Sequence, residues 1–158
     1  MSDDIKKLCV FSLIFGLICG VAALLPVLGV IILLMMIFCS SFIIMVVMKK
    51  LGYLYCTTEQ IGLSYGAIAG FTAFIGFSIL FLPCSFILSL LFKESYYTGI
   101  AMILKSGFTL SATLIIFIGI LCAMMNAFSG LASVYFFNTN KKEEKFTLDI
   151  KKEKNNGF

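Results

Sequence analysis

Long apolar runs constrain this chain more than any other feature. Between Leu8 and Phe137, the charged residues are Lys49, Lys50, Glu59, Lys93, Glu94 and Lys105. A helix that spans a bilayer needs about 20 consecutive apolar residues, and four stretches of the chain reach that length. The composition, 61% hydrophobic and 13% charged, also differs from the ~45–50% apolar and ~25% charged residues of soluble domains. The sequence therefore predicts an all-α membrane protein that folds as a four-transmembrane-helix bundle.

The predicted transmembrane domain covers residues 1–137, with spans at about 8–25, 27–48, 58–82 and 107–137. The first two runs would form a helix of about 60 Å if they were continuous, which is twice the hydrocarbon thickness. The chain must therefore reverse between them, and Pro26 and Gly29 are the local break signals.

The region after the third span contains a proline, a short apolar segment and a stretch with two lysines and two tyrosines. Pro83 is expected to end or kink the third helix, because proline lacks the backbone N–H that a helix needs. Residues 84–92 are too short to cross a bilayer, so they either continue the helix beyond a kink or lie along the interface. Residues 93–105 are predicted to form a loop, with Tyr96 and Tyr97 at the membrane boundary.

The lysines predict the orientation. With four spans, ten of the 12 lysines fall on one side of the membrane, and the other two are Lys93 and Lys105. The ten are Lys6, Lys7, Lys49, Lys50, Lys141, Lys142, Lys145, Lys151, Lys152 and Lys154. Since cytoplasmic segments carry the excess of lysine, both termini should face the cytoplasm from a bacterial-type inner membrane.

The tail, residues 138–158, mixes lysine, glutamate and asparagine and cannot bury a core of its own. It is predicted to be a disordered or weakly helical cytoplasmic segment. Its first lysines can contact anionic lipid or serve as an ordinary positive-inside anchor. The net charge of +4 does not indicate a nucleic-acid partner, because the lysines lie at the membrane edges.

Small residues recur at helical spacing in three of the spans. These candidate helix-packing residues are Gly16, Gly20, Gly62, Gly66, Gly70, Gly119 and Ala123. Such stripes let helix backbones approach closely, as in glycine-zipper packing, either within one chain or between subunits. The second span has no such stripe after Gly29, so it is expected to be the most lipid-facing helix.

Two segments of the chain resemble each other. Residues 12–23 align with residues 62–73 at an offset of fifty positions. The identical pairs are Leu13/Leu63, Gly16/Gly66, Ile18/Ile68, Gly20/Gly70 and Ala23/Ala73. The similarity has two explanations: duplication of a helical hairpin, or convergence between apolar helices that use few residue types.

The candidate polar path consists of Asn126, Ser129 and Ser133 in the fourth span. Asn126 is the strongly polar side chain that lies deepest in a span. It is expected to hydrogen-bond a neighbouring helix, and the alternative is that it lines a path for a solute. Glu59 begins the third span, where the helix dipole favours a carboxylate; the alternative is a cytoplasmic gate or ion contact.

The sequence gives no sign of catalytic machinery. It contains no histidine, and its serines have no convincing base nearby, so no enzyme activity and no cofactor are predicted. Met36 with Cys39, and Cys122 with Met125, could offer soft ligands to Cu(I). Methionine and cysteine are also common packing residues, so no metal site is predicted.

The expected function is therefore a non-catalytic integral membrane subunit. Its partners would be the bilayer and either further copies of the chain or a larger membrane complex. The alternative is a small oligomeric channel or holin-like pore, with the polar face of the fourth span lining the lumen.

Overall fold

The computed structural model describes residues 3–53, 58–92 and 95–155. Within these ranges the chain is helical and contains no strand. The helices are α1 (Asp3–Ala22), α2 (Pro26–Lys50), α3 (Glu59–Leu91), α4 (Ser95–Lys105) and α5 (Phe108–Asn155). Among the described residues, four segments are long and apolar enough to cross a membrane, namely α1, α2, α3 and the Phe108–Asn138 part of α5. The predicted helical class and the presence of four long apolar helices are confirmed, as expected of a multi-pass membrane protein.

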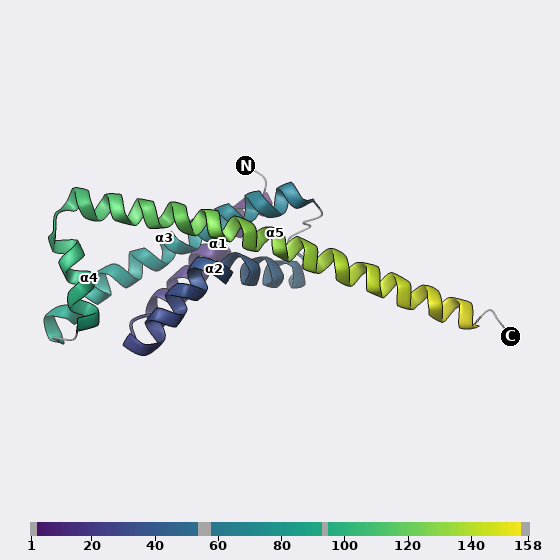
Figure 1. Cartoon of the computed structure of the whole chain (residues 1–158), viewed down its shortest axis with the longest axis horizontal. Helices are drawn as coiled ribbons and strands as arrows, with labels where there is room; N and C mark the ends of the chain where they lie inside the picture. The colour runs from purple at the N-terminus through teal and green to yellow at the C-terminus, as the bar shows by residue number, and fades with distance from the viewer. Residues whose placement is uncertain (1–2, 54–57, 93–94, 156–158) are drawn as a thin grey trace.

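The long helices lie side by side, with the connections at opposite ends of the molecule (Figure 1). The N-terminus, the end of α2 and the start of α3 lie toward one end, and α5 leaves the other helices there. The α1–α2 turn and α4 lie toward the opposite end (Figure 1). Consecutive long helices are therefore antiparallel, whereas α1 runs parallel to α3 and α2 runs parallel to α5.

The α1–α2 turn is as short as the sequence demands. Only three residues separate Ala22 from Pro26, and the N–H of Leu24 bonds the carbonyl of Val21 at 3.1 Å. Pro26 begins α2, where its missing N–H costs nothing because the first N–H groups of a helix have no internal partner.

Helix α3 does not stop at Pro83. It continues to Leu91 and Phe92 is its C-cap, so residues 84–91 are a helical continuation rather than a separate interfacial segment. The predicted loop is wrong over residues 95–105, which form α4, while Lys93 and Glu94 lie outside the described residues. The reason is an apolar face: Ile100, Ile103 and Leu104 line an apolar cavity against the long helices, so this short segment packs as a helix.

Helix α5 contains 48 residues, which corresponds to about 72 Å. This length is more than twice the hydrocarbon thickness, so the helix must leave the bilayer. It continues through the lysine-rich tail to Asn155 and extends beyond the other helices (Figure 1). Of the two tail conformations that the composition left open, the structure has the helical one.

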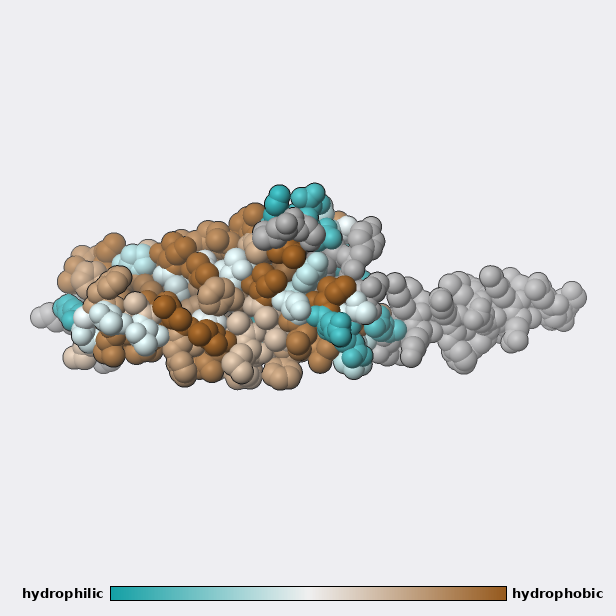
Figure 2. All heavy atoms as spheres, turned by 90° about the horizontal axis from the view of Figure 1, so that it is seen from above, coloured by the Kyte–Doolittle hydropathy of each residue, from teal (hydrophilic) through white to brown (hydrophobic). Residues whose placement is uncertain are grey.

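The outside of the helical body is mostly apolar. Figure 2 shows hydrophobic residues along most of its length and hydrophilic ones gathered where α5 leaves the body. A surface of this kind suits lipid, because helices satisfy their own backbone groups and hydrocarbon solvates the side chains. The second span is not the most lipid-facing one: 28% of its apolar window is buried, against 17% for the α5 span. The buried positions of α2 include Met36, Ser40, Ser41, Ile44 and Met45, so one face of this helix packs against the body.

Candidate functional site

The most polar site inside the body is built around Asn126 of α5, which is fully buried. Its Oδ1 accepts hydrogen bonds from the Ser40 hydroxyl at 2.9 Å and from the Ser41 backbone N–H at 2.8 Å. Its Nδ2 lies 3.0 Å from the Met36 carbonyl oxygen and 2.9 Å from that of Ile37. All of these partners belong to α2, so the amide links the two helices.

Asn126 also meets a specific point of the α2 backbone. A regular helix pairs the N–H of Ser41 with the carbonyl of Ile37, and both groups bond the Asn126 amide. One residue further on, the N–H of Phe42 donates to the Ser129 hydroxyl at 3.2 Å. Side chains that insert into the backbone ladder in this way bend helices. Helix α2 is accordingly bent in its middle (Figure 1).

Ser133 completes this side of α5. Its hydroxyl donates to the Gly130 carbonyl at 2.6 Å and lies 3.4 Å from the sulfur of Met45 on α2. The three residues of the candidate polar path therefore all face α2 and all have partners there or in α5. Their placement matches the helix–helix role better than the solute-path role, because they are engaged in a closed interface.

A second interface joins α3 to α5 through small residues. A Cβ atom added at Gly66 would lie 2.5 Å from the Asn126 carbonyl oxygen and 2.9 Å from the Cα of Gly130. At Gly62 it would lie 2.5 Å from a methyl carbon of Val134. Gly70 has a different function, because a Cβ there would collide with the side chain of Asn126. The backbones of α3 and α5 thus approach closely, and Gly70 leaves the room that Asn126 occupies.

The small residues of α1 face the other side of α3. A Cβ at Gly20 would lie 3.0 Å from the Phe77 carbonyl oxygen, and one at Gly16 would collide with the Ala73 carbonyl. Gly76 of α3 is equally close to α1, with 2.5 Å to the Leu13 carbonyl oxygen. Helix α3 is therefore the central element, with α1 on one face and α5 on another.

Two candidates lie further along α5. A Cβ at Gly119 would be 3.2 Å from the Phe71 ring and 3.3 Å from the Phe74 ring, so this glycine faces aromatic side chains of α3 rather than its backbone. Ala123 is half-buried. Neither residue belongs to the closest part of the α3–α5 interface.

Two tyrosines tie α4 to the α1–α2 turn. The Tyr97 hydroxyl donates to the Leu24 carbonyl at 2.6 Å, and that of Tyr96 donates to the Ala23 carbonyl at 3.0 Å. These carbonyls lie just beyond the end of α1, where a helix leaves its acceptors unpaired. Burial raises the pKa of Tyr96, and the neighbouring Tyr97 raises it further. The Tyr96 hydroxyl therefore keeps its proton and remains a donor.

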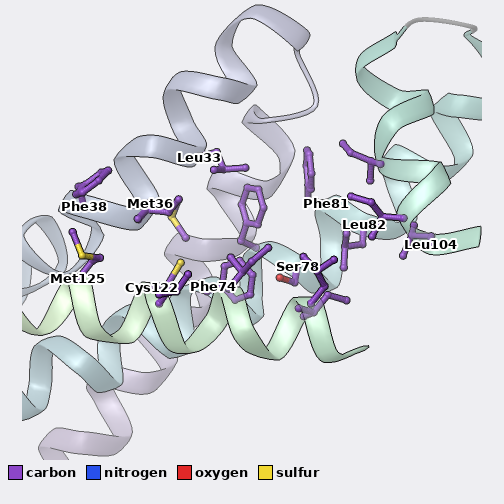
Figure 3. A pocket seen from close by; sticks show the side chains of 18 residues that line it. Leu33, Met36, Phe38, Phe74, Ser78, Phe81, Leu82, Leu104, Cys122 and Met125 are labelled. Atoms are coloured by element: carbon purple, nitrogen blue, oxygen red, sulfur yellow. The ribbon is translucent and has the colours of Figure 1, made fainter. Parts of the chain in front are cut away.

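A cavity of about 560 Å³ lies between α2, α3, α4 and α5 (Figure 3). Its lining residues are almost all apolar, namely Leu33, Met36, Ile37, Phe38, Phe74, Phe77, Ser78, Phe81, Leu82, Ile100, Ile103, Leu104, Leu114, Ile115, Ile118, Leu121, Cys122 and Met125. The candidate polar path does not contribute to this lining. The cavity is therefore suited to an apolar ligand and unsuited to an ion.

The soft-ligand residues are only partly brought together. Met36, Cys122 and Met125 line the cavity, whereas Cys39 is exposed on the outside of α2. Among the described residues, no group of three or more His, Cys, Asp or Glu side chains could hold a metal ion. The structure thus separates the Met36–Cys39 pair that shares a helix face in the sequence.

Charged side chains gather near the N-terminus and the end of α2. The Lys7 ammonium lies 5.2 Å from the centre of the Tyr53 ring, and that of Lys49 lies 3.5 Å from the centre of the Phe137 ring. Glu59 is a hydrogen-bonding partner of the exposed Tyr135. This end of the body therefore combines cations with aromatic rings, a combination typical of a membrane–water interface.

Sequence reasoning found Asn126 but missed most of its partners. Ser40 and Ser41 lie in a run of isoleucine, methionine and valine and look like ordinary small packing residues. The small residues at positions 69, 73 and 76 of α3 were missed as well, although their three- and four-residue spacing predicts a second face. Comparison with protein-family models, with curated proteins and with solved structures found no match for this chain.

Proposed function

We propose that the chain is a non-catalytic integral membrane subunit whose four spans form a bundle held together by small-residue faces and one buried amide. The observation that carries this proposal is the environment of Asn126. The polar side chain deepest in the apolar region directs both ends of its amide at α2. A residue used in this way serves architecture, and a catalytic or solute-binding amide would need a free face.

The small-residue faces are occupied within the chain, so an association with other subunits must use another surface. The part of α5 beyond the other helices offers one outside the bilayer (Figure 1). We therefore infer that the membrane body is a self-contained module. Further copies of the chain, or a larger membrane complex, would contact its outer helical surface or the α5 extension.

Both termini are proposed to face the cytoplasm of a bacterial-type inner membrane. The lysine distribution supports this orientation, because Lys6, Lys7, Lys49 and Lys50 accompany the tail lysines at one end. A groove lined by Lys6, Lys7 and Tyr53 lies at the same end and suits contact with anionic lipid headgroups.

A duplicated helical hairpin is proposed as the origin of the two halves, supported by the identities at an offset of fifty residues. The halves have diverged, since Gly16 packs on α3 whereas its counterpart Gly66 packs on α5. Homologous sequences that preserve the offset would support this origin. Homologues in which the similarity falls to that of unrelated apolar helices would contradict it.

The experiment that tests the subunit role has two parts. The full chain, tagged at its N-terminus, is isolated from its native membrane in lipid nanodiscs, and its mass is measured together with that of any bound protein. We expect a defined assembly with further copies or a stoichiometric partner. The same preparation in proteoliposomes should show no ion or dye flux above that of empty vesicles. Flux that scales with protein, or a chain that is monomeric and without partners, would contradict the proposal.

A further inference from the structure

The apolar cavity between α2, α3, α4 and α5 is not needed for the subunit role. The exposed fractions of its lining side chains distinguish a buried floor from an open mouth. Phe77 and Phe81 on the floor are 4% and 5% exposed. Phe38 and Leu121 at the mouth are 49% and 43% exposed. The cavity is thus a lateral pocket that opens between α2 and α5 and ends on α3 (Figure 3).

The surroundings limit what can fill this pocket. Its mouth lies among exposed apolar side chains of α2 and α5, which in a bilayer would face lipid hydrocarbon. Its walls carry one side-chain hydroxyl, that of Ser78, and apolar cavities of this kind stay free of water. The volume of about 560 Å³ lies within the ~300–1,000 Å³ range of ligand pockets. An apolar chain that enters from the bilayer fits these conditions.

The length of the pocket fits one leaflet. On α5 the lining runs from Leu114 to Met125, which are eleven residues apart, or about 17 Å along the helix. Half of a ~30 Å hydrocarbon core is about 15 Å, the depth that one acyl chain covers. The pocket therefore extends from mid-span toward the end of the body at which α4 lies.

Charge supports a phospholipid rather than a neutral apolar molecule. Leu104 lines the pocket, and the exposed Lys105 follows it as the last residue of α4. A phosphate group at the membrane surface would meet a cation there, because a lysine at the end of a membrane helix extends its ammonium to the headgroup level. This lysine also suits the C-terminus of α4, so the charge alone would not define a site without the pocket beside it.

We propose that this lateral pocket binds one acyl chain of a bilayer phospholipid, with its phosphate toward Lys105. The bound chain completes the packing between α4 and the α2–α5 pair, where the protein itself leaves a void. The inference requires that the helices lie in a bilayer, but it does not depend on the subunit role.

The test uses the full chain in proteoliposomes that contain a phospholipid with a diazirine in the half of one acyl chain that is nearer the headgroup. After illumination, the carbene adducts are mapped by mass spectrometry. Ring carbons of Phe77 and Phe81 should be labelled, because a chain in the pocket reaches them although the annular lipid does not. Labelling confined to exposed residues such as Phe117 and Ile120 would overturn the proposal.

Two neighbouring positions on α3 give a matched pair of variants. Ser78→Phe extends a side chain into the pocket, whereas Ile79→Phe changes a side chain that is 60% exposed on the outside. We expect Ser78→Phe to reduce the labelling of Phe77 and Phe81 several-fold and Ile79→Phe to leave it unchanged. Unchanged labelling in a folded Ser78→Phe protein would contradict the proposal. If that variant does not fold, the adduct map of the unmodified chain decides.

Discussion

Asn126 lies in a stretch of α5 whose sequence neighbours, from Met124 to Phe128, are otherwise apolar. An unpaired amide at this depth would be costly, because hydrocarbon offers no hydrogen-bonding partner. The Ser40 hydroxyl and backbone groups of α2 supply the hydrogen-bonding partners. The amide thereby fixes the register between two helices that otherwise meet through interchangeable apolar side chains.

Replacement of this amide should destabilise the protein. Asn126→Leu leaves the Ser41 N–H and the Ile37 carbonyl without their side-chain partner, a loss of about 1–3 kcal/mol for buried groups. The thermal midpoint in detergent, measured by loss of the monodisperse chromatographic peak, should fall by several degrees. Ser129→Ala removes the hydroxyl that accepts the hydrogen bond of the Phe42 N–H on α2, and it should cause a smaller decrease. If Asn126→Leu melts at the temperature of the parent protein, the amide does not hold the helices together.

The sequence identifies Asn126 but not its partners, for a physical reason. A strongly polar side chain in an apolar run must find a partner, so its importance follows from solvation alone. Which groups satisfy it depends on the register of α2 against α5. That register is a tertiary property, and backbone N–H groups carry no sequence signal.

Helix α3 is the element on which the other helices pack. Its small residues occupy two faces, one against α1 and one against α5. The four-residue spacing of the glycines at 62, 66 and 70 indicates the face toward α5. The face toward α1 is less obvious in the sequence because alanine at positions 69 and 73 replaces glycine there.

A large side chain on the α5-facing side of α3 should force the two helices apart. Gly66→Ile places a branched side chain against the backbone of residues 126–130, and overpacking of this kind costs about 1–3 kcal/mol. The thermal midpoint in detergent should fall while the assembly state stays the same, because the contact lies within one chain. Leu63→Ile, on the exposed side of α3, serves as the control and should change neither quantity. Dissociation of an oligomer by Gly66→Ile, with no loss of midpoint, would show that the face packs between subunits.

Helix α4 shows where sequence reasoning fails at the level of elements. Charged residues and tyrosines around a short segment are typical of a loop. The apolar positions of this segment favour a helix only because they line a cavity against the other helices, which the sequence alone does not show. Its attachment through Tyr96 and Tyr97 could not be predicted, because the acceptors are turn carbonyls more than seventy residues earlier.

The docking of α4 can be tested through one hydroxyl. Tyr97→Phe removes the hydrogen bond to the Leu24 carbonyl and keeps the ring, which should cost about 1 kcal/mol. Because α4 packs at the edge of the body, the effect should be local. Hydrogen–deuterium exchange should increase in α4 and in the α1–α2 turn, with little change in the α3–α5 interface. An increase in exchange of similar size in all helices, or no increase relative to the parent protein, would argue against this attachment.

The four apolar helices can be predicted from the sequence with little ambiguity, since span length and hydropathy are properties of single segments. Their arrangement does not follow, because it depends on contacts between segments. The tail could be predicted only in part. Its composition indicates that it cannot bury a core, but not that α5 continues through it as a helix.

Removal of residues 141–158 should therefore leave the membrane body intact. The deleted part of α5 extends beyond the other helices, and Lys6, Lys7, Lys49 and Lys50 remain to set the orientation (Figure 1). We expect an inserted protein whose thermal midpoint stays within a few degrees of that of the full chain. Loss of insertion, or a mixture of orientations, would mean that the tail contributes to assembly of the body.

Thiol labelling of intact cells can show whether the chain spans the membrane four times with both ends in the cytoplasm. In a background without native cysteines, a single cysteine replaces either Gly99 on α4, where an added Cβ meets no other atom, or the exposed Lys50 at the end of α2. A membrane-impermeant maleimide should label the Gly99→Cys protein in intact cells and the Lys50→Cys protein only after the cells are opened. Labelling of Lys50→Cys from outside, or protection of Gly99→Cys until lysis, would contradict this topology.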